Sequence, residues 1–308
     1  MIIGQGNVAA DVSRILAKTV DELKHTDIAQ HALDCLAASK VRNIYVIGRR
    51  GPAQAKFTSK ELKEFGELSD CHPTIAPAEL QINPESETEL ADKSNAGSKK
   101  IFELFQEYAS LPPDPVKSKK CHFTFLKSPV EIQGDGRVSR IILERNRLSG
   151  AAFQQSARGT GERVSLDAGI VFRSIGYQGV AMPGVPFDGR KGVIPNDKGR
   201  VTDNDGKPIL QLYCAGWIKR GPTGIIGTNR ADSVATVESL LEDLDLFDSK
   251  ERKAGSAGIY PILDERGIRH VSFSDWKKID QHEVERGMSK GKPREKYTRV
   301  EEMLALLK

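Results

Sequence analysis

The sequence has few cysteines, and no two of them are arranged to hold a metal or a disulfide. Four cysteines occur among 308 residues, and none forms a C-x-x-C pair. This spacing argues against a structural zinc site, a bound iron–sulfur cluster and a redox-active disulfide. The six histidines also lack the spacing of metal ligands. We therefore expect no metal site, and we expect the thiols to be buried and reduced.

Long hydrophobic runs and a strong excess of one charge are also absent. No apolar run approaches the roughly 18 residues that a membrane helix needs, so at most a peripheral membrane association is expected. Lysine and arginine number 46 against 42 acidic residues, and a net charge of +4 is too small to indicate a nucleic-acid partner. No signal or transit peptide is visible. With 38% hydrophobic residues, the chain can bury the cores of two domains.

The most informative motif is GQGNVAADVSRIL, at residues 4–16. It contains the pattern G-x-G-x-x-A, which joins a β-strand to a helix in dinucleotide-binding folds. Gly4 would permit the tight turn, Gly6 would let the backbone approach a pyrophosphate, and Ala9 would keep the helix close to the sheet. The helix would offer free N–H groups and the positive end of its dipole to a phosphate. An ordinary strand-to-helix turn has the same pattern, so the motif needs support from elsewhere.

The motif lies very close to the start of the sequence. Only Met1, Ile2 and Ile3 precede Gly4, whereas a strand of a buried sheet usually has about 5–6 residues. We therefore expect the sequence to begin inside a structural element.

Two arginines follow the second expected strand. The apolar run Ile44–Ile47 ends at Gly48-Arg49-Arg50-Gly51-Pro52. At this point of a dinucleotide fold, an acidic residue binds the 2′-hydroxyl of NAD, whereas arginine accommodates the 2′-phosphate of NADP. Guanidinium suits phosphate because its planar fork can make two hydrogen bonds at once. The pair favours NADP, and a solvent-exposed basic turn is the alternative.

Periodicity and turn residues predict an α/β domain followed by a region of different character. In the first half we expect helices at 7–18, 28–36, 58–65 and around 101–108, strands at 43–48, 122–126 and 169–175, a hairpin over 130–145, and surface loops at 81–98 and 150–162. Thr26 or Asp27 is expected to cap the second helix, and Thr58 or Ser59 the third. In the second half we expect a buried strand at 210–216, a turn at 221–224, a helix at 228–244, a linker at 249–256 and short helices around 273–281 and 300–307.

Several segments occur in an order that points to one family. They are GQGNVAADVSRIL, GRRGPAQAKFTSKEL, RSIGY, GVIPN, YCAGWIKRGPTGIIGT, SFSDWKKID and GKPREK. From residue 1 to residue 308, the chain resembles the NADPH–adrenodoxin reductase family, the mitochondrial-type ferredoxin–NADP reductases. The resemblance implies an α/β, glutathione-reductase-like fold with two dinucleotide domains, here lacking the N-terminal FAD-binding half-domain. Residues 1–177 would be the Rossmann-like NADP-binding domain, and residues 178–308 the C-terminal portion of the FAD-binding domain with tail helices.

The same resemblance assigns roles to individual residues. It places the pyrophosphate turn at Gly4, Gln5, Gly6, Asn7 and Val8, the 2′-phosphate pair at Arg49 and Arg50, and an acidic NADP contact at Glu61. On the FAD side it places a flavin contact at Trp217 and the turn along the flavin at Gly224, Ile225 and Ile226. Gly224 would also meet the nicotinamide and is the catalytic candidate. A core aromatic at Trp217 and an ordinary tight loop at 221–224 are the alternatives.

The family's function implies two cofactors and a protein partner. The chain would use NADP and FAD to pass electrons from NADPH to a ferredoxin- or adrenodoxin-type [2Fe–2S] protein in the mitochondrial matrix. Such partners are acidic, so a basic docking surface is expected, with Lys99, Lys100 and Lys290–Lys296 as candidates. A solvent-exposed basic face without a docking role is the alternative. The alternative is a truncated isoform or fragment that binds NADP(H) but cannot retain FAD and is not active alone. A dehydrogenase acting directly on a small substrate lacks support, because no Ser-x-x-x-Tyr-x-x-x-Lys relay is present.

Overall fold

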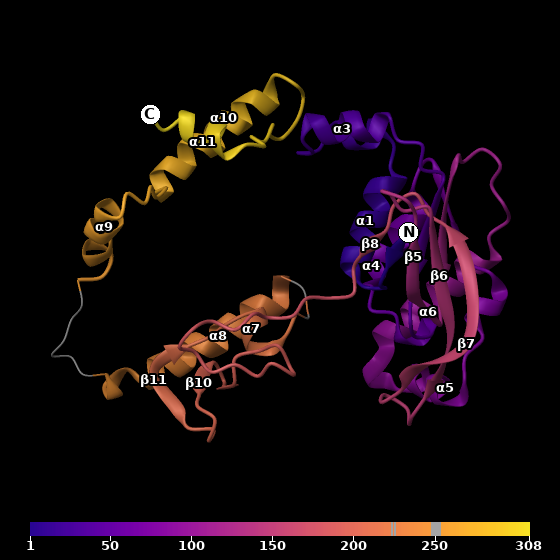
Figure 1. Cartoon of the computed structure of the whole chain (residues 1–308), viewed down its shortest axis with the longest axis horizontal. Coiled ribbons are helices and arrows are strands. Elements are labelled where there is room, and N and C mark those ends of the chain that lie inside the picture. Colours follow the sequence, from indigo (N-terminus) through magenta and orange to yellow (C-terminus); the bar gives the residue numbers. More distant parts are fainter. Residues whose placement is uncertain (223, 225, 248–253) are drawn as a thin grey trace. The chain divides into compact units, whose positions relative to one another are not determined.

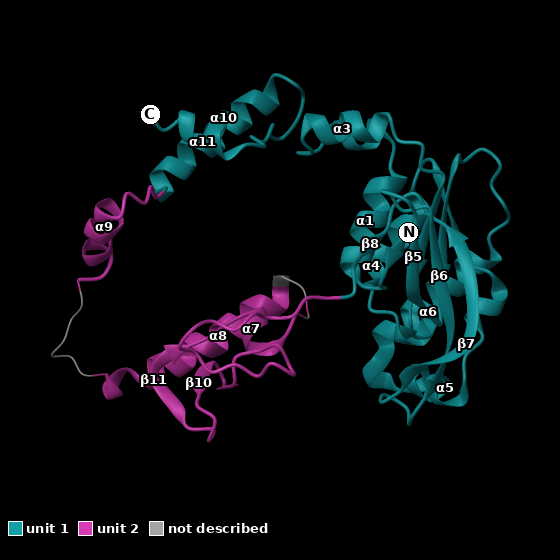
Figure 2. Cartoon of the chain, in the orientation of Figure 1, with its two compact units in different colours: residues 1–175, 271–308 teal, residues 176–270 magenta. Residues whose placement is uncertain are grey.

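The computed structural model describes residues 1–222, 224, 226–247 and 254–308 (Figure 1). The chain forms two compact units (Figure 2): Met1–Ile175 with Val271–Lys308, and Gly176–His270. The tail from residue 271 therefore belongs to the same unit as the N-terminal segment. The cofactor domains at 1–177 and 178–308 remain a prediction, since they are defined by ligand contacts rather than by compactness.

The described part of the first unit contains a parallel sheet of five strands. The spatial order is β3 (Cys71–Thr74), β4 (Lys119–Thr124), β2 (Asn43–Ile47), β1 (Ile2–Ile3) and β8 (Phe172–Arg173). Every neighbouring pair is parallel, with Ile2 opposite Val46 and Ile44 opposite Cys121. The carboxyl ends of the strands consequently meet at one edge of the sheet.

Helices α1 (Asn7–Ala17), α4 (Ser59–Glu67) and α6 (Ala96–Ser110) cover one face of this sheet. The other helical elements of this region are α2 (Val20–Leu23), α3 (Gln30–Ala37) and α5 (Pro84–Ala91), with short 3₁₀ turns η1 (Pro52–Gln54), η2 (Pro77–Leu80) and η3 (Lys93–Asn95). Ile44 and Val46, two residues apart on β2, both face the helices and join a core that contains Phe65, Phe105 and Phe123. Fully burying each such side chain contributes about 1.5–3 kcal/mol, so this aromatic cluster is a main stabilising element of the unit.

An antiparallel meander covers the other face, as Figure 1 shows. It consists of β5 (Lys127–Gln133), β6 (Arg140–Ser149) and β7 (Ser156–Asp167). Ile3 and Ile47 of the parallel sheet pack against Ile141 and Leu143 of β6. The predicted loop at 150–162 is therefore wrong from residue 156 onward, where β7 begins.

Three further local predictions are wrong. The segment 81–98 is not a loop, because it contains α5, η3 and the start of α6. Neither Thr26 nor Asp27 caps α3, since its N-cap is Ala29. The thiols are also not all buried: Cys71, Cys121 and Cys214 are buried, whereas Cys35 is exposed.

The tail contains α10 (Phe273–Met288) and α11 (Val300–Ala305). Ser272 and Asp275 form a capping box at the start of α10. The buried Lys292 donates to the Ile28 carbonyl at 2.9 Å and pairs with Glu295 at 2.8 Å. The hydrogen bond from Lys292 to Ile28 attaches the tail to the segment that precedes α3.

The described residues of the second unit form a small antiparallel sheet with helices. Its strands are β9 (Asn196–Asp197), β10 (Arg200–Thr202) and β11 (Pro208–Tyr213), and its helical elements are α7 (Trp217–Arg220), α8 (Ile226–Glu242), η4 (Leu244–Leu246) and α9 (Ser256–Glu265). The predicted buried strand at 210–216 is wrong in two respects, because β11 ends at Tyr213 and Leu210 is 54% exposed. The predicted linker falls partly on 248–253, outside the described residues, and α9 was not predicted. Among the described helices, none is long and apolar enough to cross a bilayer.

Candidate functional site

The predicted nucleotide-binding residues lie at the carboxyl edge of the parallel sheet. The turn Gly4–Val8 follows β1, and the loop Gly48–Gly51 follows β2. Gly4 N donates to Ile47 O at 2.8 Å, which joins the turn to the end of β2, and Gly48 N donates to Thr124 O at 2.9 Å, which joins the loop to the end of β4. In open α/β sheets, ligands bind outside the carboxyl ends of the strands. The structure thus brings both predicted motifs to the edge where a nucleotide is expected.

The two glycines of the turn have different physical reasons to be glycine. Gly4 has φ +131°, and a Cβ there would overlap the Ser174 carbonyl oxygen. Gly6 has φ −124°, which any residue can adopt, and nothing lies within 4 Å of the position of its missing Cβ. Gly6 is the N-cap of α1 and makes no side-chain cap bond. The helix therefore presents its first N–H groups to an open space, which suits a phosphate.

Hydrogen bonds of Gln5 and Asn7 hold the turn in place. Gln5 Nε2 donates to Thr124 O at 2.9 Å, and the Gln5 carbonyl accepts from Lys56 N at 2.8 Å. Asn7 Oδ1 accepts from Thr58 N at 2.8 Å. Val8 is 44% exposed. These bonds fix the backbone of the turn while leaving the N–H groups of α1 available.

Two side-chain oxygens beside the turn are buried without a partner. Glu61 lies in the first turn of α4, and its Oε2 accepts no hydrogen bond among the described residues. The hydroxyl of Thr58, the backbone N-cap of α4, is likewise buried and unpaired, although the sequence predicted a capping bond from Thr58 or Ser59. Buried polar atoms normally have partners. Thr58 contacts the turn through its N–H, which donates to Asn7 Oδ1, and Glu61 lies in the same first turn of α4.

The arginine loop has a fixed backbone and available side chains. The carbonyls of Gly48 and Arg50 accept from the backbone N–H groups of Lys127 and Leu126, each at 3.0 Å. Arg49 is exposed and Arg50 is half-buried. Within the described part of the chain, neither guanidinium has a hydrogen-bond or ion-pair partner. Both can therefore reach an anionic group without first breaking a contact.

A buried polar cluster, which the sequence did not reveal, lies behind this loop. Glu89 of α5 is 4% exposed and accepts from Gln54 Nε2, Gln155 Nε2 and Phe153 N, each at 2.8 Å. Burial alone would raise the pKa of Glu89, but the hydrogen bonds from Gln155 and Gln54, the Phe153 N–H and the charge of Arg50 lower it overall. Glu89 is thus a buried carboxylate within electrostatic range of Arg50.

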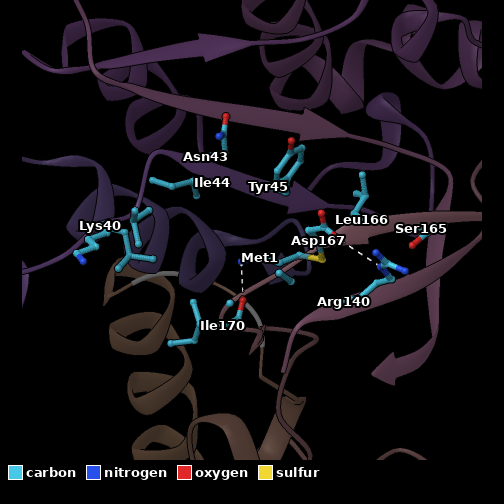
Figure 3. Close-up of a pocket in the computed structure, with 14 residues that line it drawn as sticks. Met1, Lys40, Asn43, Ile44, Tyr45, Arg140, Ser165, Leu166, Asp167 and Ile170 are labelled. Atoms are coloured by element: carbon cyan, nitrogen blue, oxygen red, sulfur yellow. Dashed lines mark hydrogen bonds and ion pairs between the residues drawn. The ribbon is translucent and has the colours of Figure 1, made fainter. Parts of the chain in front are cut away.

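A cavity of about 860 Å³ lies at the opposite, amino edge of the sheet (Figure 3). Its walls include Met1, Asn43, Tyr45 and an Arg140–Asp167 ion pair with an N–O distance of 3.1 Å. None of the predicted site residues lines it. Since ligands of such sheets bind at carboxyl edges, the site is assigned to the edge with the glycine turn rather than to this cavity.

The predicted flavin-side residues lie in the second unit. Trp217 is 47% exposed and stacks on Tyr177 with ring centroids 5.6 Å apart, so it is not a core aromatic. Gly224 has φ +92°, and a Cβ there would overlap the hydroxyl of Thr228. Ile226 is the first residue of α8, and Ile225 lies outside the described residues. The structure therefore groups the NADP-side residues in one unit and the described flavin-side residues in the other.

The expected docking cations differ in their surroundings. Lys99 and Lys100 are exposed on α6. By contrast, the cations of 290–296 are engaged in ion pairs: Lys290–Glu295 at 3.7 Å, Lys292–Glu295 at 2.8 Å, Arg294–Asp280 at 2.6 Å and Lys296–Asp27 at 2.7 Å. Much of the positive charge in this stretch is therefore neutralised locally.

Comparison with known proteins gives close relatives. The chain is 42% identical over 318 residues to the mitochondrial NADPH:adrenodoxin oxidoreductase of Arabidopsis thaliana, covering 99% of this chain and 65% of the relative. It is 41% identical to the mitochondrial enzyme of Homo sapiens, with 100% and 63% covered. No protein-family model matches.

Solved structures agree with the sequence comparison. FprA, an oxidoreductase of Mycobacterium tuberculosis, superposes with a TM-score of 0.88 at 38% identity, over 99% of this chain and 66% of FprA. FprA has also been solved in complex with NADPH. The predicted α/β fold of the two-dinucleotide-domain reductases is thus confirmed, and the chain spans slightly less than two thirds of its relatives' length. By sequence and fold, the chain belongs to the NADPH:adrenodoxin oxidoreductase and NADPH-ferredoxin reductase family.

Proposed function

We propose that the chain binds NADP(H) at the carboxyl edge of its parallel sheet. The observation that carries this proposal is the pair Arg49 and Arg50, unpaired within the described residues and directly after β2, next to the open N-terminus of α1. The backbone N–H groups of Gly6, Asn7 and Val8 would receive the pyrophosphate, aided by the helix dipole. The guanidinium groups would hold the 2′-phosphate, which distinguishes NADP from NAD.

Glu61 completes the proposed nucleotide site. Its buried, unpaired Oε2 would accept a hydrogen bond from the ribose or amide of the bound dinucleotide. Gln5 and Asn7 act indirectly, because their side chains hold the turn and the start of α4 in place. Binding would thus satisfy polar atoms that are buried and unpaired in this structure.

We further propose that the chain takes part in an NADPH-dependent flavoprotein reductase reaction. FAD, when bound, accepts a hydride equivalent and releases electrons singly, which matches a two-electron donor to a one-electron acceptor. Trp217, Gly224, Ile225 and Ile226 would lie along the flavin, with Gly224 next to the nicotinamide. The acceptor would be a ferredoxin- or adrenodoxin-type [2Fe–2S] protein, because relatives are named for adrenodoxin and ferredoxin. The mitochondrial names of several relatives support a mitochondrial location, and we propose the matrix within it.

A second function is nucleotide binding without FAD. The specific observation in its favour is that Gly4–Val8, Arg49, Arg50 and Glu61 all lie in one compact unit with its own hydrophobic core. NADP(H) binding would then not require a flavin. Absorbance of the purified chain in the flavin bands separates the two functions: one tightly bound FAD per chain favours the reductase, and a colourless chain that binds NADP(H) favours the nucleotide-binding module.

The proposed nucleotide site is tested with 2′,5′-ADP and 5′-AMP, which differ in the 2′-phosphate. Isothermal titration should show tighter binding of 2′,5′-ADP to the wild type. The double variant Arg49→Ala/Arg50→Ala should lose about 1.5–3 kcal/mol for each charge-assisted contact removed, with 5′-AMP little affected. Arg42→Ala is the matched control, because Arg42 precedes β2 at the amino edge. Equal binding of both ligands by the wild type, or an unchanged preference in the double variant, would refute the proposal.

A further inference from the structure

Strand β6 of the meander buries different sides of its chain in its two halves, and the change lies beside the arginine loop. In the first half of β6, the odd-numbered Ile141 and Leu143 are fully buried against the parallel sheet. Farther along the strand the even-numbered Asn146 is buried, at 8% exposure, whereas Arg145 is exposed. Side chains of a regular strand alternate with a period of two, so the buried side of β6 changes between residues 143 and 146.

The pairing of β6 with β7 also shifts at this place. It moves from Glu144 opposite Arg163 to Asn146 opposite Gly159, so one residue of β6 and three of β7 lie between these pairs. The excursion is held by a hydrogen bond from Gly161 N to Glu144 Oε1 at 2.8 Å. Bulges re-aim the side chains that follow them and are frequent next to functional sites. Here the extra residues lie in β7, and the side chain of Asn146, the first β6 residue paired after the shift, is buried.

Both amide hydrogens of Asn146 have fixed acceptors. Its Nδ2 donates to the backbone carbonyl of Arg49 at 2.9 Å and to Ser128 Oγ at 2.8 Å. Its backbone N–H donates to Leu126 O at 2.7 Å. The side-chain amide is therefore held in one orientation, with one hydrogen directed at the arginine loop.

The carbonyl that Asn146 holds lies between the two arginines. The flanking carbonyls of Gly48 and Arg50 are held by backbone N–H groups of the β4–β5 connection, whereas the carbonyl of Arg49 is held by this side chain. Because a peptide group is planar, fixing the carbonyl of Arg49 fixes the plane that links the Cα atoms of Arg49 and Arg50. The relative direction of the two side chains depends on that plane.

We propose that Asn146 is a positioning residue for the adenosine 2′-phosphate. By holding the peptide plane between Arg49 and Arg50, it directs both guanidinium groups to one anionic site and so increases the preference for NADP(H) over NAD(H). The antiparallel meander, through Asn146, thereby contributes to nucleotide specificity. This inference rests on the proposed role of the arginine pair.

The experiment measures the dissociation constants of 2′,5′-ADP and 5′-AMP by isothermal titration. In Asn146→Leu, which is close in shape but donates no hydrogen bond, the constant for 2′,5′-ADP should rise roughly five- to tenfold and that for 5′-AMP by less than about twofold. Ser128→Ala, which frees the amide without touching the loop, should give a smaller change in the same direction. Asn43→Leu is the control, because it makes the same substitution at the other end of β2 and should change neither constant.

Each outcome decides between a positioning role and a merely structural one. A loss of affinity for both ligands to the same degree in Asn146→Leu would overturn the proposal, because a structural role does not distinguish them. If Asn146→Leu does not fold, Ser128→Ala decides, and an unchanged ratio of the two constants would overturn it. If Arg49→Ala/Arg50→Ala abolishes the preference while Asn146→Leu leaves it intact, this inference alone falls. If the double arginine variant has no effect, the proposed nucleotide site itself falls.

Discussion

Replacing Glu89 with glutamine tests how much a buried carboxylate stabilises α5 and the arginine loop. One carboxylate oxygen of Glu89 accepts from Gln155 Nε2 and Phe153 N, and the other accepts from Gln54 Nε2. Glutamine has a single acceptor oxygen, so in either orientation its NH₂ group must face at least one of these donors. A lost hydrogen bond to a charged group costs about 1.5–3 kcal/mol. We therefore expect Glu89→Gln to lower the free energy of unfolding by about 2 kcal/mol at neutral pH.

The pH dependence gives this prediction a second, independent measurement. Because folding lowers the pKa of Glu89, its ionised form favours the folded state. That stabilisation is fully present above the unfolded-state pKa of about 4.3 and is lost as the pH falls through the lower folded-state pKa. The difference in stability between wild type and Glu89→Gln should therefore shrink on acidification below about pH 4.3.

Urea unfolding at several pH values provides the assay. Glu103→Gln, on the exposed side of α6, is the matched control and should change stability by less than about 0.5 kcal/mol at neutral pH. If Glu89→Gln were as stable as the wild type at neutral pH, or if the difference between them stayed constant down to pH 3, the carboxylate would not have the role described.

Two further predictions follow from charges and hydrogen bonds elsewhere in the first unit. Charge reversal of the exposed Lys99 and Lys100 should weaken binding to an acidic [2Fe–2S] protein roughly three- to tenfold at low salt. Lys296→Glu should weaken binding less, because Lys296 already pairs with Asp27. A binding titration in which Lys296→Glu has the larger effect would contradict the assignment. Tyr108 donates to Leu62 O at 2.7 Å and accepts from Gly66 N at 3.2 Å, so Tyr108→Phe should lower the unfolding free energy by about 1–2 kcal/mol; an unchanged urea midpoint would refute this.

The sequence predicted those elements whose apolar residues recur with a clear period. Residues 7–18 and 43–48 were expected as a helix and a strand, and α1 and β2 lie there within one residue at each end. α5 was missed because its buried face consists of Ser86, Glu89 and Leu90, two of which are polar. A helix that packs through a buried hydrogen-bond network leaves no apolar stripe in the sequence.

The candidate site divides in the same way. The glycine turn and the arginine pair were predicted because their residue types reflect local backbone and charge requirements. Glu89 and Asn146 were not, because each acts through contacts between segments far apart in the chain, 35 residues for Glu89 with Gln54 and 97 for Asn146 with Arg49. Only the fold shows that the buried polar cluster around Glu89 and the meander both lie next to the arginine loop. The bulge of β7 opposite Arg145 has no marker in the sequence beyond Gly159 and Gly161, which also suit an ordinary loop.

Gly6 offers a test of the pyrophosphate site that leaves the fold intact. Its backbone is extended, and nothing lies within 4 Å of the position that a methyl group would take, unlike at Gly4 and Gly224, where positive φ and overlap with neighbouring atoms forbid a side chain. Gly6→Ala should therefore change stability by less than about 1 kcal/mol, because the weaker N-cap is offset by a less flexible unfolded chain. The added methyl would occupy the space where a pyrophosphate approaches the backbone, so the dissociation constants of NADP⁺ and NAD⁺ should rise together, roughly tenfold or more. The preference between them should stay unchanged, in contrast to the arginine variants. Gly97→Ala, also with open space at its Cβ, is the control; if Gly6→Ala bound both dinucleotides as tightly as this control, the turn would not contact the pyrophosphate.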